Sequence, residues 1–211
     1  MYVPRHFEQS HLDLMQAALE RIQVATLVTS GPDGLFVSHL PMMLDRNSGP
    51  FGTLVGHLAR ANPHWSVGAD QPAVAIFFGP NGYISPNWYA TKRETQKVVP
   101  TWDYIAVHAR GTLRTFDQPE RLLALITALT NLHESRSAQP WHVDDAPEPF
   151  VASQLKAIVG LELPIDVLVG KWKLSQNRPA EDIDGVIAGL RAIGDRGSLE
   201  LAHAVEDARP A

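Results

Sequence analysis

The sequence predicts a mainly antiparallel β fold with flanking helices, an α+β protein built as a barrel or a sandwich. About six β-rich segments occupy the first half of the chain, joined by turns and not by crossover helices, which argues against a parallel βαβ sheet. In the second half the hydrophobic period changes to that of helices. With 211 residues, 45% of them hydrophobic and 19% charged, the chain has the composition of an ordinary globular protein.

The first half begins with one helix and continues with strands. Apolar residues recur at helical spacing from Leu12 to Ile22, after the possible cap Ser10. Residues 24–29 and 35–44 are β-rich and flank Gly31-Pro32-Asp33-Gly34, a sequence typical of a hairpin turn. The further expected strands are residues 51–58, 73–78, 83–89, 98–111 and 113–116, and Pro86 indicates an edge or a bulge in the third of these.

The second half contains most of the expected helices. Asp117 is the expected cap of a helix that runs to about Glu134 with Pro119 in its first turn. A polar loop over residues 135–148, a helix over 150–159, one long strand or a strand pair over 161–174 and a helix over 182–193 follow. No linker composition interrupts residues 1–194, which we expect to form a single domain, and residues 195–211 read as a partly ordered tail.

Composition limits the classes of function. The formal net charge of −5 argues against a general nucleic-acid surface, because phosphate binding requires clustered Lys and Arg. The absence of cysteine excludes disulfides, thiolate metal sites and a cysteine nucleophile. The N-terminus lacks a secretory signal and no apolar run approaches about 20 residues, so we expect a cytoplasmic protein that does not span a membrane.

A polar and aromatic corner follows the strand at residues 51–58. Asn62 and Pro63 are typical of a helix start, and Arg60 precedes them, so the corner suits a phosphate group. His57 and His64 flank the corner, but no HxH, HxxxH or HExxH pattern occurs, and hydrogen-bonded surface histidines are more plausible than metal ligands. No metal site is therefore predicted.

The sequence gives weaker support to other kinds of active or binding site. Ser38, His39 and Asp103 suggest a hydrolase, yet no GxSxG motif is present and adjacent residues of a strand point to opposite faces. GxGxxG after a strand and GxxxxGK[ST] are also absent. Four aromatic residues either form a stacking wall for a flat ligand or pack the barrel and a dimer interface: Tyr83, Trp88, Tyr89 and Trp102. Three basic residues form either the cationic edge of a pocket or a solvated strand end: Lys171, Lys173 and Arg178.

Five ordered blocks resemble the signature blocks of the PaiB family, described as FMN-binding negative transcriptional regulators. The blocks are MYVPRHF at residues 1–7, GHLARANP at 56–63, YISPNWY at 83–89, VPTWDY at 99–104 with Val107-His108, and KLSQNR at 173–178. The resemblance implies a six-stranded antiparallel Greek-key split barrel of the FMN-binding type, flanked by helices. It also implies a homodimer with two FMN sites between the subunits.

The resemblance further implies a set of cofactor-binding residues. Arg60 and Asn62, with backbone N–H groups of the strand-helix corner around His57 and Ala59, are expected at the FMN phosphate. Ser38, His39, Leu40 and Pro41 belong to the strand expected along the isoalloxazine ring, and Thr101, Trp102, Asn177 and Arg178 are expected to close the pocket. Asp103 departs from the family, which often has Asn there.

The function expected from the resemblance is that of an FMN-binding protein related to PaiB-type regulators. Lys156 is the one basic residue of the helix predicted over residues 150–159, which argues against direct DNA binding. A flavin-dependent oxidoreductase, similar to pyridoxamine-phosphate oxidases or flavin reductases, and a haem-binding relative remain as alternatives. No catalytic residue is assigned, because flavin hydride chemistry often needs no protein base.

Overall fold

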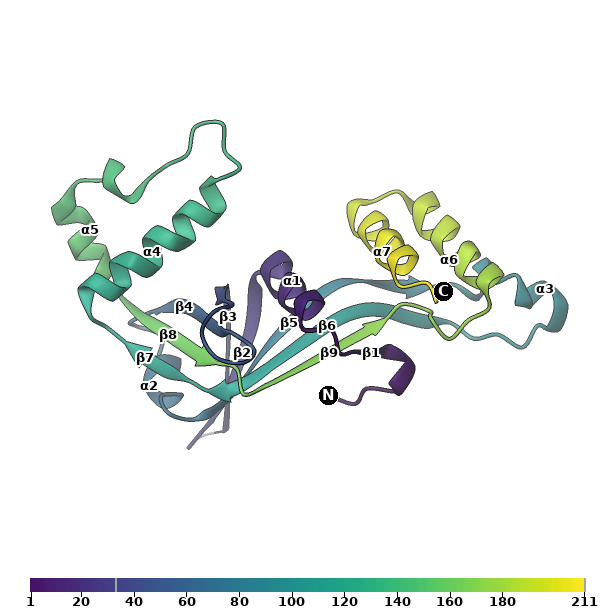
Figure 1. Cartoon of the computed structure of the whole chain (residues 1–211), viewed down its shortest axis with the longest axis horizontal. Coiled ribbons are helices and arrows are strands. Elements are labelled where there is room, and N and C mark those ends of the chain that lie inside the picture. The colour runs from purple at the N-terminus through teal and green to yellow at the C-terminus, as the bar shows by residue number, and fades with distance from the viewer. Residues whose placement is uncertain (33, 211) are drawn as a thin grey trace. The chain divides into compact units, whose positions relative to one another are not determined.

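The computed structural model describes residues 1–32 and 34–210, which cluster into two compact units (Figure 1). The first unit contains residues 1–18, 78–107 and 169–210, and the second contains Leu19–Phe77 and His108–Leu168. Asp33 of the predicted hairpin turn and Ala211 of the predicted tail lie outside the described residues. The single domain expected over residues 1–194 stays a prediction.

The described strands form an antiparallel sheet of nine strands, in the order β1-β9-β6-β5-β2-β3-β4-β8-β7. The order has two ends, so the prediction of six strands closed into a barrel is wrong in both strand number and closure. One added strand is the short β1 (Glu8–Gln9). Another arises because residues 161–174 are parts of two strands, β8 (Ile158–Pro164) and β9 (Val167–Lys173). Between these strands the N–H groups of Ile165 and Asp166 donate to the carbonyls of Gly52 and Arg110.

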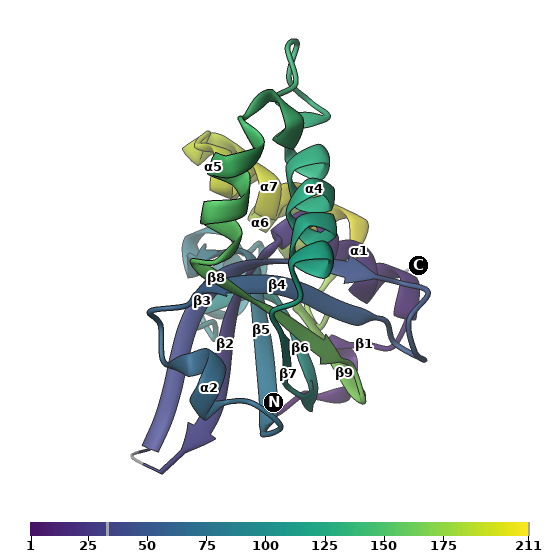
Figure 2. The ribbon, with the colours of Figure 1, turned by 90° about the vertical axis from the view of Figure 1, so that its left-hand side faces the viewer.

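In the second unit, a hairpin leads into three further paired strands, β4, β8 and β7 (Figure 2). β2 (Val24–Gly31) pairs with β3 (Gly34–Asp45) up to Gly31↔Gly34, which confirms the predicted hairpin. β3 pairs with β4 (Thr53–Ala59), and β4 pairs with β8, which in turn pairs with β7 (Arg114–Phe116). β5 (Pro72–Ile84) and β6 (Thr101–Thr112) contribute residues to both units.

A helical layer packs on one face of β3, β4 and β8. This face carries Met43, Val55 and Ile158, and we call it the outward face. It contains α4 (Pro119–Glu134), the short η3 (Val143–Asp145) and α5 (Glu148–Leu155). Its apolar contacts join two helices and four strands: Phe116, Leu122, Leu125, Leu129, Leu155, Met43, Val55 and Ile158. The predicted span of α4 is confirmed, but Asp117 as its cap is wrong: Gln118 holds the N-cap position, without a side-chain hydrogen bond. The helix predicted over 150–159 ends earlier because Ile158 already belongs to β8.

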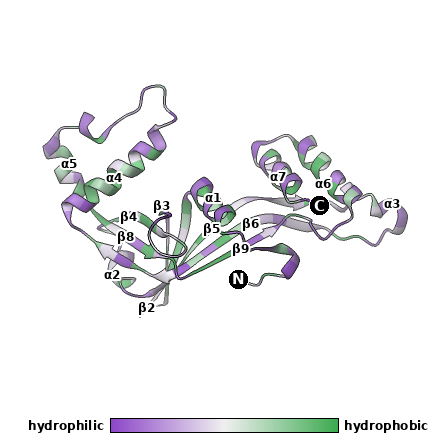
Figure 3. Ribbon diagram, viewed as in Figure 1, coloured by the Kyte–Doolittle hydropathy of each residue, from purple (hydrophilic) through white to green (hydrophobic). Residues whose placement is uncertain are grey.

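The first unit buries a separate cluster of hydrophobic residues beneath two C-terminal helices. α6 (Ala180–Ile193) and α7 (Arg196–Asp207) carry hydrophobic and hydrophilic faces, as amphipathic helices do (Figure 3). The tail expected to be partly ordered therefore forms α7 over residues 196–207, where Leu201 and Val205 are buried. Its N-cap Asp195 accepts a hydrogen bond from the Ser198 N–H at 2.9 Å.

The aromatic segment at residues 83–89 is not the strand predicted. β5 continues from the strand predicted over 73–78 through residues 79–82 and ends at Ile84. A 3₁₀ helix, η2 (Pro86–Trp88), follows because the Ser85 side chain caps it by accepting from the Asn87 N–H. Two more short helices are present: η1 (Arg5–Phe7) precedes the predicted α1 (Leu12–Ile22), and α3 (Thr91–Thr95) lies between η2 and β6.

Over residues 1–32 and 34–210, no helix combines the length and apolar character needed to cross a membrane.

Candidate functional site

The corner after β4 ends in a helix of one turn. The Asn62 side chain accepts a hydrogen bond from the His64 N–H at 3.0 Å, and α2 (His64–Val67) then begins. Pro63 takes the N-cap position. Because the dipole of a helix sums over aligned peptide units, a helix of four residues offers little attraction for an anion. A phosphate near this corner would have to be held by side chains.

His64 is a buried link between two strands of the second unit. Its Nε2 lies 2.9 Å from Oγ1 of Thr29 on β2, and its Nδ1 lies 2.8 Å from Oγ of Ser38 on β3. Asn62 Nδ2 also donates to Ser38 Oγ at 3.1 Å. Burial lowers the pKa of His64, which favours the neutral ring with one donating and one accepting nitrogen. Ser38, Asn62 and His64 thus fix the position of the corner.

Arg60 joins the end of β4 to the beginning of β8. Its Nε donates to the carbonyl of Lys156 at 2.9 Å and its Nη2 to the carbonyl of Ile158 at 3.1 Å. Its Nη1 lies 3.8 Å from Oδ2 of Asp117, the residue that was predicted to cap α4. Arg60, Lys156 and Asp117 also line a pocket of about 410 Å³. Any phosphate at Arg60 would therefore share the guanidinium with these protein oxygens.

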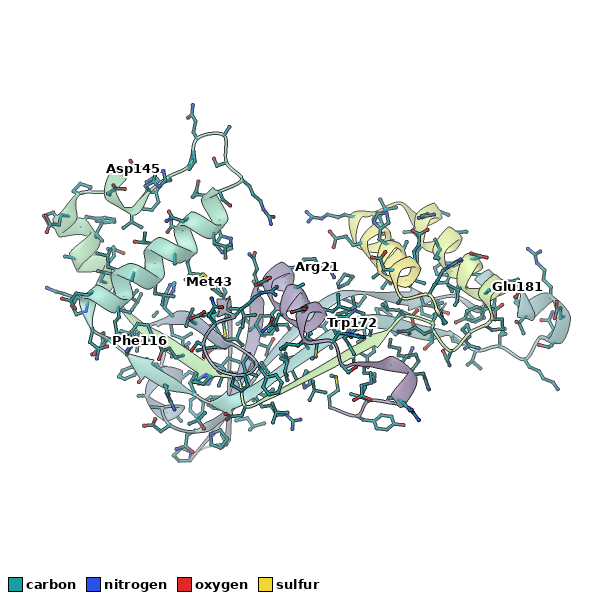
Figure 4. The ribbon with its side chains drawn as sticks, in the orientation of Figure 1. Arg21, Met43, Phe116, Asp145, Trp172 and Glu181 are labelled. Carbon is teal, nitrogen blue, oxygen red and sulfur yellow. The ribbon has the colours of Figure 1, made fainter. Side chains whose placement is uncertain are left out.

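Four predicted site residues share the outward face of β3 and β4. Met43, labelled in Figure 4, is the register partner of Val55, and both pack against the helical layer. Because side chains alternate along a strand, the face of Met43 and Val55 also carries His39, Pro41, His57 and Ala59. His39, Pro41 and Ala59 are exposed. Ser38 and Leu40 have buried side chains on the opposite face, so their side chains do not reach this outward face.

The remaining predicted site residues lie in the first unit. Lys173 Nζ lies 2.5 Å from Thr101 Oγ1 and 2.6 Å from the carbonyl of Trp102. Trp102 is half exposed, and its ring makes an edge contact with that of Tyr83 at a centroid distance of 6.4 Å. Asn177 is exposed.

The aromatic residues expected to form one stacking wall are divided between surface and core. Tyr83 and Trp102 form an exposed pair. Tyr89, by contrast, is 1% exposed, and Trp88 packs against the same core cluster. The guanidinium of Arg178 lies 4.7 Å from the centre of the Tyr89 ring. Only the exposed pair can offer a ring to a ligand from outside the core.

Comparison with known proteins identifies the family. Residues 1–167 match the model of the FMN_bind_2 family, described as "Putative FMN-binding domain". The chain belongs to this FMN-binding family. The chain is 28% identical over 208 residues to protease synthase and sporulation protein PAI 2 of Bacillus subtilis, an alignment that covers 98% of this chain and 97% of that protein. It is 30% identical to uncharacterized protein AN0679 of Emericella nidulans, with the same coverage of 98% and 97%. The resemblance to the PaiB family is thus confirmed.

Solved structures support the same fold at low sequence identity. The FAD and heme binding protein of Mycobacterium smegmatis aligns with a TM-score of 0.61 and 16% identity, over 86% of this chain and 80% of that one. The flavocytochrome Anf3 of Azotobacter vinelandii aligns with a TM-score of 0.57 and 12% identity, over 81% of this chain and 72% of that one. At these identities the likeness shows the fold alone: α+β, with a large antiparallel sheet, as in flavin-binding split-barrel proteins.

On the second unit, the FMN-binding family domain has a face whose residue types are chemically compatible with a flavin. The outward face of β3 and β4 offers small side chains, Pro41 and Ala59, against which a planar ring can lie, and two imidazoles, His39 and His57. His57 Nδ1 is buried without a hydrogen-bond partner among the described residues. The family match covers this face but ends before Asn177 and Arg178. Family membership therefore supports FMN as the cofactor.

A buried charged cluster in the first unit was missed by the sequence reasoning. Asp103 is fully buried on β6, accepts a hydrogen bond from Ser175 Oγ at 2.6 Å and lies 3.4 Å from Lys173 Nζ. Burial raises the pKa of Asp103, while Ser175 and Lys173 oppose that effect. The available signal was an acidic residue within the alternating strand predicted over residues 98–111.

We predict that Asp103→Asn gains in stability relative to the native protein as pH rises from about 3.5 to 7. The unfolded carboxyl has the ordinary pKa of 3.8 and the folded one a higher pKa. Between these values the folded protein binds more protons, so the native protein loses stability as pH rises through the folded pKa, and the variant does not. Urea unfolding at several pH values measures the difference.

Asp195→Asn is the control for this pH dependence. Hydrogen bonds from Ser198 lower the pKa of Asp195, so its contribution to stability is lost as pH falls. The stability of Asp195→Asn relative to the native protein should therefore change with pH in the opposite direction. Parallel pH profiles for native protein and Asp103→Asn would contradict the assignment of Asp103.

Proposed function

We propose that this protein binds FMN on the outward face of β3 and β4, with the phosphate toward Arg60. The observation that carries the proposal is the common face of His39, Pro41, His57 and Ala59, which lies within the residues matched by the FMN-binding family. Bound FMN would supply electron and hydride transfer. The two small residues let the ring approach the strands, and the exposed imidazole of His39 provides hydrogen-bonding groups along it.

The phosphate side of the proposed site depends on positive charge. Arg60 and Lys156 line the same pocket, and Asp117 opposes part of their charge. Because Arg60 already donates to two carbonyls, we expect only its remaining N–H groups to donate to the phosphate. The positive charge of the guanidinium would also attract the phosphate. Asn62 stabilises this end of the site, because its side chain donates a hydrogen bond to Ser38 Oγ and accepts one from the His64 N–H.

We predict that Ala59→Glu weakens FMN binding at least tenfold. The exposed side chain allows the substitution without disturbing the core, while its carboxylate puts bulk and negative charge on the proposed flavin face. Fluorescence quenching of FMN during titration with protein measures the affinity. Ala192→Glu, an exposed alanine of α6, is the matched control and should bind as the native protein does. Equal affinities of both variants would remove this face from the site.

Thr101, Trp102, Asn177 and Arg178 belong to the proposal as a second set of flavin contacts, contributed in part by a partner subunit. Support for a homodimer comes from hydrophobic side chains that the second unit leaves exposed, among them Leu35 and Val37 of β3. Light scattering tests this association: a dimer has twice the chain mass of 23.2 kDa, and a particle of 23.2 kDa would contradict it.

A second candidate is a regulatory function that acts through a partner protein. The match to PAI 2 over nearly the whole chain favours it, since that protein is named for protease synthesis and sporulation. With a formal charge of −5, direct DNA binding has little electrostatic support. A DNA titration at several salt concentrations distinguishes the two routes, because direct phosphate contacts weaken steeply with salt. Assays of the FMN-loaded protein with nicotinamide donors test the oxidoreductase alternative, and a haem titration tests the haem-binding one.

A further inference from the structure

A second cavity adjoins the proposed flavin face inside the second unit. It has a volume of about 240 Å³ and lies between β4, the beginning of β8 and the helical layer of α4, η3 and α5. Its walls are mostly apolar and include Ile126, Phe150 and Leu155, with Trp141 beside them. Trp141 and Phe150 are about half exposed, so two aromatic rings remain available to a molecule that enters.

His57 is the ionisable group of this cavity lining. Its Nδ1 is enclosed by protein and makes no hydrogen bond with a described residue, whereas Nε2 is not among the enclosed atoms. Burial lowers the pKa of His57, so the ring is neutral at pH 7 and carries one proton. An enclosed N–H without an acceptor costs more than an enclosed bare nitrogen, so the proton belongs on Nε2. His57 thus presents a hydrogen-bond donor.

The lining also defines which charges the cavity accepts. Apart from neutral His57, its residues carry no formal charge, and Gln154 contributes an uncharged amide. An ionic ligand would lose its hydration without gaining a charged partner, which disfavours its binding. A neutral ligand with aromatic surface suits the apolar walls, and an acceptor oxygen suits the Nε2–H group.

We propose that this cavity binds a small, neutral, planar molecule of one or two rings that carries a carbonyl oxygen, and that His57 donates a hydrogen bond to that oxygen. The inference extends the proposed function, because His57 also lies on the flavin face and a molecule in the cavity would be a neighbour of the flavin. The cavity would then be the substrate site of the same centre.

Two probe molecules of the same shape test the hydrogen bond. 1-Tetralone has two fused rings and a ketone, and tetralin has the same rings without the ketone. By calorimetric titration of the FMN-free protein, we expect 1-tetralone to bind about five- to tenfold more tightly than tetralin, the effect of one net hydrogen bond. His57→Phe keeps an aromatic ring but removes the donor, and it should bind the two probes equally.

Two variants of exposed alanines test the location. Ala157 lines this cavity, whereas Ala192 is an exposed alanine of α6 that does not. Ala157→Trp should abolish binding of 1-tetralone, and Ala192→Trp should leave it unchanged. Equal affinity of the native protein for the two probes, absence of saturable binding, or unchanged binding to Ala157→Trp would overturn the inference.

An FMN titration of the same samples separates the two proposals. Normal FMN binding without 1-tetralone binding overturns the cavity inference and leaves the flavin site intact. Binding of 1-tetralone with no FMN binding overturns the proposed function, and with it the role of the cavity as a substrate site, while the ligand class itself is upheld.

Discussion

Gly185→Ala is expected to destabilise the protein by about 2–3 kcal/mol, although alanine is the better helix former. An added Cβ at Gly185 of α6 would lie within 1.8 Å of the Trp88 carbonyl oxygen, a distance that no rotamer change relieves. Backbone of η2 or α6 would have to move, and both pack on the buried cluster of the first unit. Urea unfolding monitored by circular dichroism measures the loss.

Gly197→Ala is the matched control for this substitution. Gly197 also lies in a helix of the first unit, but its nearest neighbour would be an Asp195 carboxylate oxygen at 3.4 Å, an ordinary contact. This variant should be as stable as the native protein or more stable by up to about 1 kcal/mol. If Gly185→Ala also proves harmless, α6 does not approach Trp88 as closely as described.

His64→Phe is expected to destabilise the protein by about 2–4 kcal/mol, because it leaves two buried hydroxyls without their partner. Thr29 would lose its imidazole contact, and Ser38 would keep only the hydrogen bond from Asn62. The ring of phenylalanine preserves much of the packing, so the loss reports mainly on hydrogen bonding. The stability is measured by the midpoint of urea unfolding at pH 7.5, where His64 is neutral.

The chain offers an exposed counterpart of the same interaction. His39 Nδ1 lies 3.0 Å from Thr26 Oγ1 at the surface, where water can replace the lost contact. His39→Phe should therefore cost less than about 0.5 kcal/mol. Similar losses in both variants would mean that burial does not set the value of the His64 contacts.

Local patterns were sufficient to predict the elements with strong periodicity. The hairpin of β2 and β3 and the span of α4 are found where alternation and helical spacing placed them. The failures occur where long-range contacts decide. α7 reads as a polar tail by composition, yet its narrow apolar stripe packs into the first unit's core. The sequence also left open whether residues 161–174 form one strand or two, because β8 and β9 are separated by hydrogen bonds from Ile165 and Asp166 to the distant residues Gly52 and Arg110.

The candidate site, too, was predicted from the sequence only in part. The sequence identified the strands and the corner, and strand alternation then places His39, Pro41, His57 and Ala59 on one face. It did not reveal that Arg60 donates to two carbonyls of a segment almost one hundred residues away. It also assigned the corner to a helix start, although α2 has only one turn. Such features depend on which segments meet, and therefore on tertiary structure.

Ser175 shows how two unrelated demands can narrow the choice of residue at one position. Its backbone has a φ of 64°, a conformation that favours glycine or asparagine, and its hydroxyl donates to the buried Asp103 carboxylate. Glycine would satisfy the backbone but lose the donor, and threonine would keep the donor but strain the backbone. Neutral drift should therefore leave this position nearly unchanged unless residue 103 changes with it, so the two sites are expected to evolve as a pair.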